Sequence, residues 1–153
     1  MSLQTLLETK AIECLKARYL RCADTKQWEA LSDCFCDDIV CDFRGATTDP
    51  VSGQHLLPGS DMVLSGRDQV MSTIIAALDT VPSIHAAFLP EIELLSETDA
   101  KGIWAMTDKL YIGAGDDAQI LVGYGHYHET YQKLEGRWKI KSLRLVRLKV
   151  ETA

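Results

Sequence analysis

The sequence predicts an α+β fold, with helices in the first half of the chain and strands in the second. Residues 3–22 and 67–78 repeat their apolar side chains at the three- to five-residue spacing of helices. After residue 78 no convincing helical spacing remains, and the pattern becomes that of strands. Strands this long must curve or bulge, so we expect the sheet to wrap around the helices and leave a cavity between them.

The first half is expected to contain three helices and one strand. Helical spacing places the first helix over 3–22. Asp24 followed by Gln27 matches a capping box, in which two side chains satisfy free amides at a helix start, and it predicts a second, short helix. Trp28, Leu31 and Phe35 are expected to form the apolar face of this helix, which ends at Asp37 and Asp38. A strand over 39–43, a long loop over 44–65 and the third helix over 67–78 are expected to follow.

The second half is expected to be a curved antiparallel sheet. The expected strands cover 83–88, 91–96, 101–112, 118–133 and 137–150, with turns at 97–99, 113–117 and 134–136. No repeat or linker interrupts this pattern, so residues 1–153 are expected to form a single domain. A chain of 153 residues closes one core. The loop over 44–65 is long enough to form a lid or a wall of a binding site.

Composition and charge exclude several classes of function. The net charge of −6 argues against a nucleic-acid partner and against an anionic membrane surface, since both attract clustered Lys and Arg. The apolar runs are too short to span a bilayer, and the N-terminus lacks a secretory signal pattern. Five cysteines without a CxxC motif indicate reduced thiols. We therefore expect a cytoplasmic protein that contacts neither nucleic acid nor membrane.

Asp108 is conspicuous in the expected strand over 101–112. Because side chains alternate along a strand, Trp104, Met106, Asp108 and Leu110 share one face, and Asp108 is the only charge among them. Asp108 therefore either lies in a pocket, faces solvent or pairs with a basic neighbour. Its apolar companions weigh against open solvent.

His85 lies in the apolar stretch VPSIHAAF, where a histidine is either a hydrogen-bonded core residue or a base. Histidine ordinarily titrates near pH 6.5 and accepts a proton at about neutral pH. A neighbouring carboxylate fixes the tautomer of such a base and stabilises its protonated form. Asp24 is a candidate for that carboxylate, unless it serves only as a helix cap.

Other candidate residues have structural explanations beside functional ones. Tyr19 ends the apolar face of the first helix, where packing is its default role. Arg147, in the last strand, forms an ion pair by default. His126 and His128 share a face of the strand over 118–133, but two histidines without a third ligand nearby predict no metal site, and contact with solvent or another subunit is the alternative.

Three segments resemble the SnoaL-like branch of the nuclear transport factor 2-like superfamily, over nearly the whole chain. They are YLRCADTKQWEALSDCF, VPSIHAAF and GHYHETYQKLEGRWKIKSLRLVR. The shared features are an Asp before a K-x-W helix start, a His in the strand after the third helix and a Y-x-K-x-x-G-x-W hairpin. The resemblance implies a cone in which a curved antiparallel sheet packs on three helices around an apolar pocket, and it implies a homodimer or homotrimer.

The resemblance also implies a site. In the dehydratases and dehydrochlorinases of the family an Asp and a His form the catalytic pair, and they match Asp24 and His85. The stretch KARYLRCADTKQWEAL is especially similar to bile-acid 7α-dehydratases of gut bacteria, which implies roles for Tyr19, Asp108 and Arg147 as well. The expected pocket residues are Phe43, Trp104, Met106, Leu110 and Tyr127. Scytalone dehydratases differ at Ala23, Phe43, Leu110, Gly125 and Tyr127, so scytalone is not the expected substrate.

The expected function is a cofactor-free dehydratase or lyase that acts on a small apolar substrate, steroid-like, polyketide-like or aromatic. His85, oriented by Asp24, would remove a proton next to a carbonyl. Tyr19 would polarise or protonate an oxygen, Asp108 would donate a hydrogen bond if kept neutral, and Arg147 would bind an oxyanion or carboxylate. The alternatives are an isomerase or cyclase with the same pocket, and a non-catalytic ligand-binding or assembly subunit such as the small subunit of a ring-hydroxylating dioxygenase.

Overall fold

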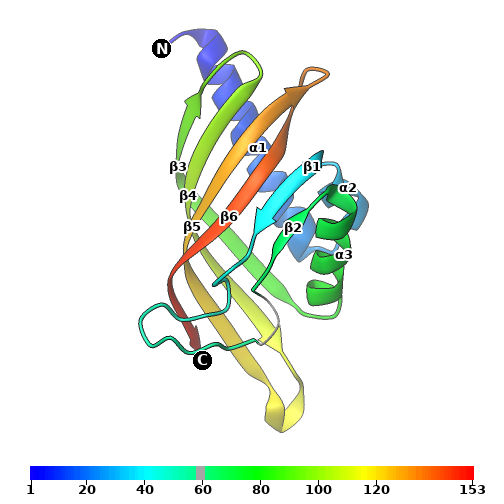
Figure 1. Ribbon diagram of the computed structural model, residues 1–153, viewed down its shortest axis with the longest axis vertical. Coiled ribbons are helices and arrows are strands. Elements are labelled where there is room, and N and C mark those ends of the chain that lie inside the picture. The colour runs from blue at the N-terminus through cyan, green and yellow to red at the C-terminus, as the bar shows by residue number, and fades with distance from the viewer. Residues whose placement is uncertain (58–60) are drawn as a thin grey trace.

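The computed structural model describes residues 1–57 and 61–153 (Figure 1). Residues 58–60 of the expected loop lie outside the described part. The helices are α1 (Leu3–Asp24), α2 (Trp28–Ser32) and α3 (Arg67–Leu78), and a 3₁₀ turn, η1, covers Gly115–Asp117. The strands are β1 (Phe35–Asp42), β2 (Val63–Ser65), β3 (Ser83–Leu94), β4 (Asp99–Ile112), β5 (Gln119–Leu134) and β6 (Arg137–Thr152). The predicted α+β class is confirmed.

The strands form one sheet in the order β2-β1-β6-β5-β4-β3. Strands β3 to β6 pair antiparallel through successive hairpins, as expected. Strand β1, however, pairs parallel with β6, so the sheet as a whole is mixed. These two strands are far apart in sequence, so no hairpin dictates the direction of their pairing.

Several expected boundaries also differ from the structure, and the short strand β2 lies within the loop expected over 44–65. The strands expected over 83–88 and 91–96 are one strand, β3, whose register against β4 shifts between Phe88 and Glu91. Leu89, within that shift, has a positive φ of 42°, so the irregularity bends the strand without ending it. In addition, β1 starts at Phe35 rather than at residue 39. The apolar face assigned to the second helix therefore continues into a strand.

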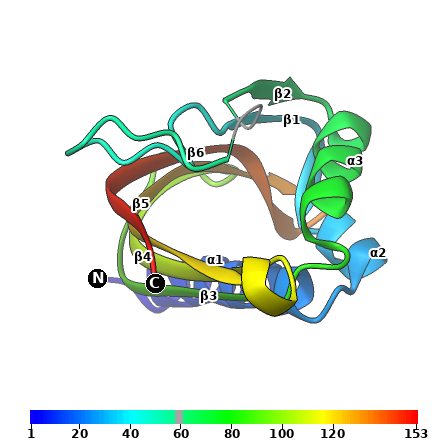
Figure 2. The ribbon, with the colours of Figure 1, turned by 90° about the horizontal axis from the view of Figure 1, so that it is seen from below.

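The sheet curls around the helices, as Figure 2 shows from below, with α1 along its inner side and α3 near β1 and β2. Burial alternates along β4, so that every second residue is buried and the residues between are more exposed. The buried residues are Ala100, Gly102, Trp104, Met106 and Asp108. Contacts of α1 with β3 and β6, and of α3 with β1, close the core. Packing the apolar face of α1 into the concave side of the sheet thus brings the C-terminal end of α1 next to the start of β3.

Candidate active site

A cavity of about 430 Å³ lies between the concave face of the sheet, the C-terminal part of α1 and α3. Its volume falls within the range of small-molecule sites. The lining is mostly apolar and is formed by Tyr19, Ala23, Leu31, Phe43, Ala46, Thr47, Met62, Thr73, Ile74, Ala76, Ala77, Leu78, His85, Asp108, Leu110, Tyr127, Leu145 and Arg147. Polar groups are few, so each is a candidate for fixing the orientation of a ligand.

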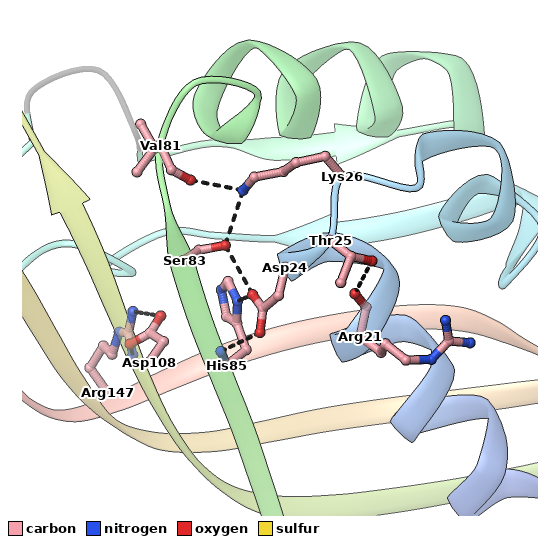
Figure 3. Close-up of polar contacts among 9 residues, drawn as sticks. All are labelled: Arg21, Asp24, Thr25, Lys26, Val81, Ser83, His85, Asp108 and Arg147. Carbon is pink, nitrogen blue, oxygen red and sulfur yellow. Dashed lines mark hydrogen bonds and ion pairs between the residues drawn. The ribbon is translucent and has the colours of Figure 1, made fainter.

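Asp24 and His85 meet at one wall of this cavity (Figure 3). Asp24 Oδ1 lies 2.6 Å from His85 Nδ1 and accepts a hydrogen bond from Ser83 Oγ at 2.9 Å. Asp24 Oδ2 accepts the backbone N–H of His85 at 2.8 Å. Because Asp24 Oδ1 accepts a hydrogen bond from a protonated Nδ1, the neutral imidazole carries its free lone pair on Nε2. The carboxylate therefore fixes both the backbone and the tautomer of the candidate base.

The end of α1 positions this carboxylate. The helix ends at Asp24, where Thr25 donates its backbone N–H to the Arg21 carbonyl oxygen at 2.9 Å. Lys26 follows with a positive φ of 59°, and its ammonium donates to the Val81 carbonyl at 2.8 Å and to Ser83 Oγ at 3.1 Å (Figure 3). The chain reversal after α1 is thereby attached to the start of β3.

The expected role of Asp24 as cap of the second helix is wrong. The N-cap of α2 is Gln27, and the structure gives it no side-chain cap hydrogen bond. Asp24 instead is the last residue of α1, where the negative end of the helix dipole disfavours a carboxylate. The hydrogen bonds from Ser83 and His85 compensate for that position. The carboxylate is thus held at the cavity wall for its contact with β3.

These contacts change the acidity of Asp24. Burial acts to raise the pKa of the Asp24 carboxyl, but the hydrogen bonds from the His85 side chain and backbone and from Ser83 outweigh it, so the pKa lies below its usual value. Asp24 therefore stays ionised at neutral pH, as a partner that stabilises a protonated imidazole must.

This lowered pKa predicts a pH dependence of stability. A carboxyl whose pKa is lowered in the folded state stabilises the fold at pH values above its unfolded-state pKa, which is about 3.9. This contribution disappears as the pH falls through the folded-state pKa. We expect Asp24→Asn to be less stable than the wild type at about pH 5 and to approach it at about pH 3. Urea denaturation at both pH values measures the gap. A gap that stays constant would show that ionised Asp24 does not stabilise the fold.

A second polar group, Asp108 with Arg147, lies beside the dyad. His85 and Asp108 are direct cross-strand partners between β3 and β4, so both project from the concave face. The Arg147 terminal nitrogens donate to Asp108 Oδ1 at 2.8 Å and Oδ2 at 2.9 Å, and its Nε donates to the Ala46 carbonyl at 2.7 Å. Both side chains are almost fully buried. Such a bidentate pair fixes the orientation of both side chains.

Of the alternatives for Asp108, pairing with a basic neighbour is the one that the structure shows, because both of its carboxyl oxygens accept hydrogen bonds from Arg147. Sequence alternation placed Asp108 on the correct face, but it gave no information on the partner. Gly123, which pairs with Asp108 across β4 and β5, was not recognised in the sequence. A Cβ at Gly123 would overlap Arg147 Nη1 and Asp108 Oδ1, so only glycine lets the guanidinium cross β5.

Gly123→Ala is accordingly expected to displace the Arg147–Asp108 pair. Overpacking a buried site typically costs about 1–3 kcal/mol of folding stability. We expect a loss of that size in urea denaturation, together with loss of ligand binding in the adjoining cavity. Lys109→Ala, an exposed substitution on the neighbouring strand β4, is the control and should leave stability unchanged. Full stability of the Gly123→Ala protein would contradict the required close approach.

Tyr19 and Tyr127 contribute hydroxyl groups to the cavity. Within residues 1–57 and 61–153, no buried side-chain nitrogen or oxygen lacks a hydrogen-bond partner. Neither tyrosine hydroxyl bonds to a described residue, although both side chains are buried and line the cavity. The hydroxyls must therefore be accessible from it. Burial, the largest cause, raises the pKa of Tyr19 well above its usual value and also raises the pKa of Tyr127, so both phenols keep their protons.

The structure brings most of the expected pocket residues together. Phe43, Leu110 and Tyr127 line the cavity, as do all the expected catalytic residues except Asp24, which reaches its wall through His85. Trp104 and Met106 are buried on the correct face but are not lining residues. Trp104 Nε1 donates to the Tyr131 hydroxyl at 2.8 Å, away from the cavity, and the sulfur of Met106 contacts Arg147 at 3.4 Å.

The histidines and helices of the described residues bear on metal binding and membrane insertion. No group of three or more His, Cys, Asp or Glu side chains is placed to hold a metal ion in the part of the chain that the structure describes. His128 is exposed on β5 and His126 is partly buried. Among the described residues, no helix combines the length and apolar character needed to cross a membrane.

Two solved structures of similar fold are named as a dehydratase and a dehydrochlorinase. A "Putative Scytalone Dehydratase" from Novosphingobium aromaticivorans DSM 12444 superposes with a TM-score of 0.78 at 24% identity, covering 99% of this chain and 91% of that chain. A hexachlorocyclohexane dehydrochlorinase, LinA Type2, superposes with a TM-score of 0.78 at 18% identity, covering 99% and 92%. At these identities the likeness concerns the fold, and it confirms the cone expected from the sequence.

Sequence comparison adds a curated relative and a family. The protein named "Probable cyclase FGR4" of Gibberella zeae is 26% identical over 134 residues, which cover 87% of this chain and 86% of the relative. The SnoaL-like domain matches residues 4–144. The names of these relatives describe enzymes that convert small molecules. The match over residues 4–144 shows that the chain belongs to the SnoaL-like domain family.

Proposed function

We propose that the protein is a lyase that eliminates water, or a similar leaving group, from a small apolar ketone or related carbonyl compound. The observation that carries the proposal is the 2.6 Å contact of Asp24 with His85 Nδ1, at the wall of an apolar cavity. This contact leaves Nε2 as the basic atom of the imidazole. The base is a side chain of the chain itself, so proton abstraction needs no cofactor.

The proposed reaction proceeds in two steps. His85 Nε2 takes a proton from the carbon next to the carbonyl, the electron pair of that C–H bond forms a C=C bond to the carbonyl carbon, and the π pair of the carbonyl moves to its oxygen. The resulting enolate then re-forms the carbonyl, and its C=C electrons form a double bond to the next carbon while the C–O bond to the hydroxyl on that carbon breaks. The departing hydroxyl takes the proton back from His85 and leaves as water, so the base is regenerated. Asp24 stabilises the intermediate imidazolium.

The charges around the cavity favour a substrate that is uncharged when it binds. Asp24 and Asp108 carry two negative charges, and the guanidinium of Arg147 is already shared by both oxygens of Asp108. A substrate carboxylate would meet an Arg147 whose charge is neutralised. We therefore propose a neutral carbonyl compound in place of the anion first expected for Arg147. The pair instead forms a rigid polar edge of the cavity.

An isomerase or cyclase is the second candidate, because one curated relative is named as a cyclase. Both reactions would begin with the same proton abstraction and would differ in whether a group leaves. Mass spectrometry of products from a panel of hydroxy-steroids, hydroxy-ketones and polyketide-like alcohols separates them. We expect a product lighter by one water, with a new conjugated absorption. A product of unchanged mass would support the isomerase or cyclase instead.

A further inference from the structure

A buried ion pair lies behind the wall of the cavity and has no part in the reaction described above. Lys16 Nζ on α1 lies 2.5 Å from Glu129 Oε1 on β5, with the two side chains 1% and 0% exposed. The other Glu129 oxygen accepts a hydrogen bond from the Tyr131 hydroxyl at 2.5 Å. Lys16 and Glu129 are not among the lining residues. The network is therefore separate from the Asp24–His85 dyad.

The ammonium of Lys16 also contacts two of the aromatic rings that line the cavity. Lys16 Nζ lies 3.5 Å from the ring centroid of Tyr127 and 4.4 Å from that of Tyr19. The two rings are edge to face, with centroids 6.4 Å apart and an interplanar angle of 86°. One cation thus touches both rings, while the hydroxyl of each is accessible from the cavity.

Folding stability alone does not explain this arrangement. Burial lowers the pKa of Lys16, and Glu129 acts against that shift, so Glu129 helps to keep the ammonium charged. Apolar residues of similar volume often stabilise a core as well as a buried ion pair does. A fixed positive charge in apolar surroundings does, however, stabilise negative charge that develops nearby during a reaction.

We propose that Tyr127 joins Tyr19 in binding the substrate oxygen, and that Lys16 is a positioning residue that fixes both rings and stabilises the negative charge that builds up on that oxygen. The inference rests on the proposed function, since the enolate oxygen is the group to be stabilised. His85, Asp108 and Arg147 also line the cavity, and Asp24 contacts His85 at its wall. Glu129 opposes the effect of Lys16 in part, but only the ammonium contacts the ring faces.

The test uses 4-nitrophenol, a phenol that enters uncharged and becomes an enolate mimic when its proton passes to His85. The visible absorption of the phenolate measures the ionised fraction of the bound probe. Tyr127→Phe and Tyr19→Phe are each expected to lower the ratio of bound phenolate to bound phenol about tenfold, as for loss of one hydrogen bond to a charged oxygen. Nitrobenzene, which lacks the hydroxyl, is expected to bind all variants equally.

Two variants of the ion pair separate charge from structure. Lys16→Met with Glu129→Gln removes both charges and is expected to lower the phenolate ratio about threefold. Glu129→Gln alone retains an acceptor for Tyr131 but removes the carboxylate that helps to keep Lys16 charged, so it is expected to lower the ratio about as much as the double variant. Lys133→Met with Glu8→Gln is the control, because that pair also lies over a ring, Trp138, but not at the cavity.

An unchanged phenolate ratio in Tyr127→Phe would overturn the role of Tyr127. An unchanged ratio in the double variant Lys16→Met with Glu129→Gln, or nitrobenzene binding weakened as much as phenolate binding, would show that Lys16 has only a structural role. The failure of wild-type protein to ionise the bound probe would overturn the whole inference. Turnover that depends on His85 is measured separately. The lyase proposal is therefore tested by that turnover and not by the binding of these probes.

Discussion

His85→Ala is expected to reduce turnover of an accepted substrate by about a thousandfold, within the range that a positioned general base supplies. The reason is geometric. Nδ1 of His85 is held 2.6 Å from Asp24 Oδ1, so that Nε2 is left with the free lone pair. No other histidine lines the cavity among the described residues. Steady-state kinetics of the purified variant, on the substrate found in the product screen, measures the loss.

The control for this variant is His128→Ala, the same substitution at an exposed histidine on the neighbouring part of the sheet. It should leave turnover and stability unchanged. Equal turnover by the wild type and by His85→Ala would remove the general base from the proposed mechanism. Binding of nitrobenzene by His85→Ala would show that the cavity remains formed in the variant, so that the loss can be assigned to chemistry.

The second large effect is expected on stability. Lys16→Met removes the partner of a carboxylate that is completely buried, since Glu129 is 0% exposed. Leaving one charge of a buried pair unpaired typically destabilises a protein by about 3–5 kcal/mol. We expect a loss of that size in urea denaturation at neutral pH. The methionine retains most of the volume of the lysine stem, so a cavity does not account for the loss.

Restoring neutrality should restore most of that stability. The double variant Lys16→Met with Glu129→Gln leaves no buried charge, and the glutamine still offers an oxygen to Tyr131. It is expected to unfold at nearly the wild-type urea concentration. Lys133→Met, which breaks a more exposed pair with Glu8, should have a much smaller effect because solvent reaches that carboxylate. Equal destabilisation by the single and double variants would contradict a charge effect.

Much of this fold could be predicted from local patterns in the sequence. Apolar spacing predicted α1 and α3, and alternation placed Asp108 and Leu110 on one face of β4. The hairpins between β3 and β6 followed from turn residues between neighbouring strands. Each of these features depends on residues close together in the chain. The parallel pairing of β1 with β6 does not, because it joins strands separated by most of the chain.

The site was harder to predict for the same reason. Alternation says which face Asp108 occupies, but only the register of β4, β5 and β6 shows that Arg147 crosses Gly123 to reach it. Lys16 lies between apolar positions of α1 and reads as a surface charge, because its partner Glu129 is 113 residues away. The capping pattern at Asp24 was misleading, because the local sequence favours a carboxylate at the start of a helix, whereas Asp24 ends α1 and is held by contacts with β3, about 60 residues away in the chain.

The proposed mechanism requires that His85, held by Asp24, removes a proton from carbon in the apolar cavity. A ketone deuterated next to the carbonyl tests this step directly, because elimination, isomerisation and cyclisation would all begin by breaking that C–D bond. The wild type is predicted to remove the deuterium from that carbon, as read by mass spectrometry of the product, and His85→Ala is predicted to remove none above the uncatalysed rate. Equal loss of deuterium with the two proteins would contradict the mechanism.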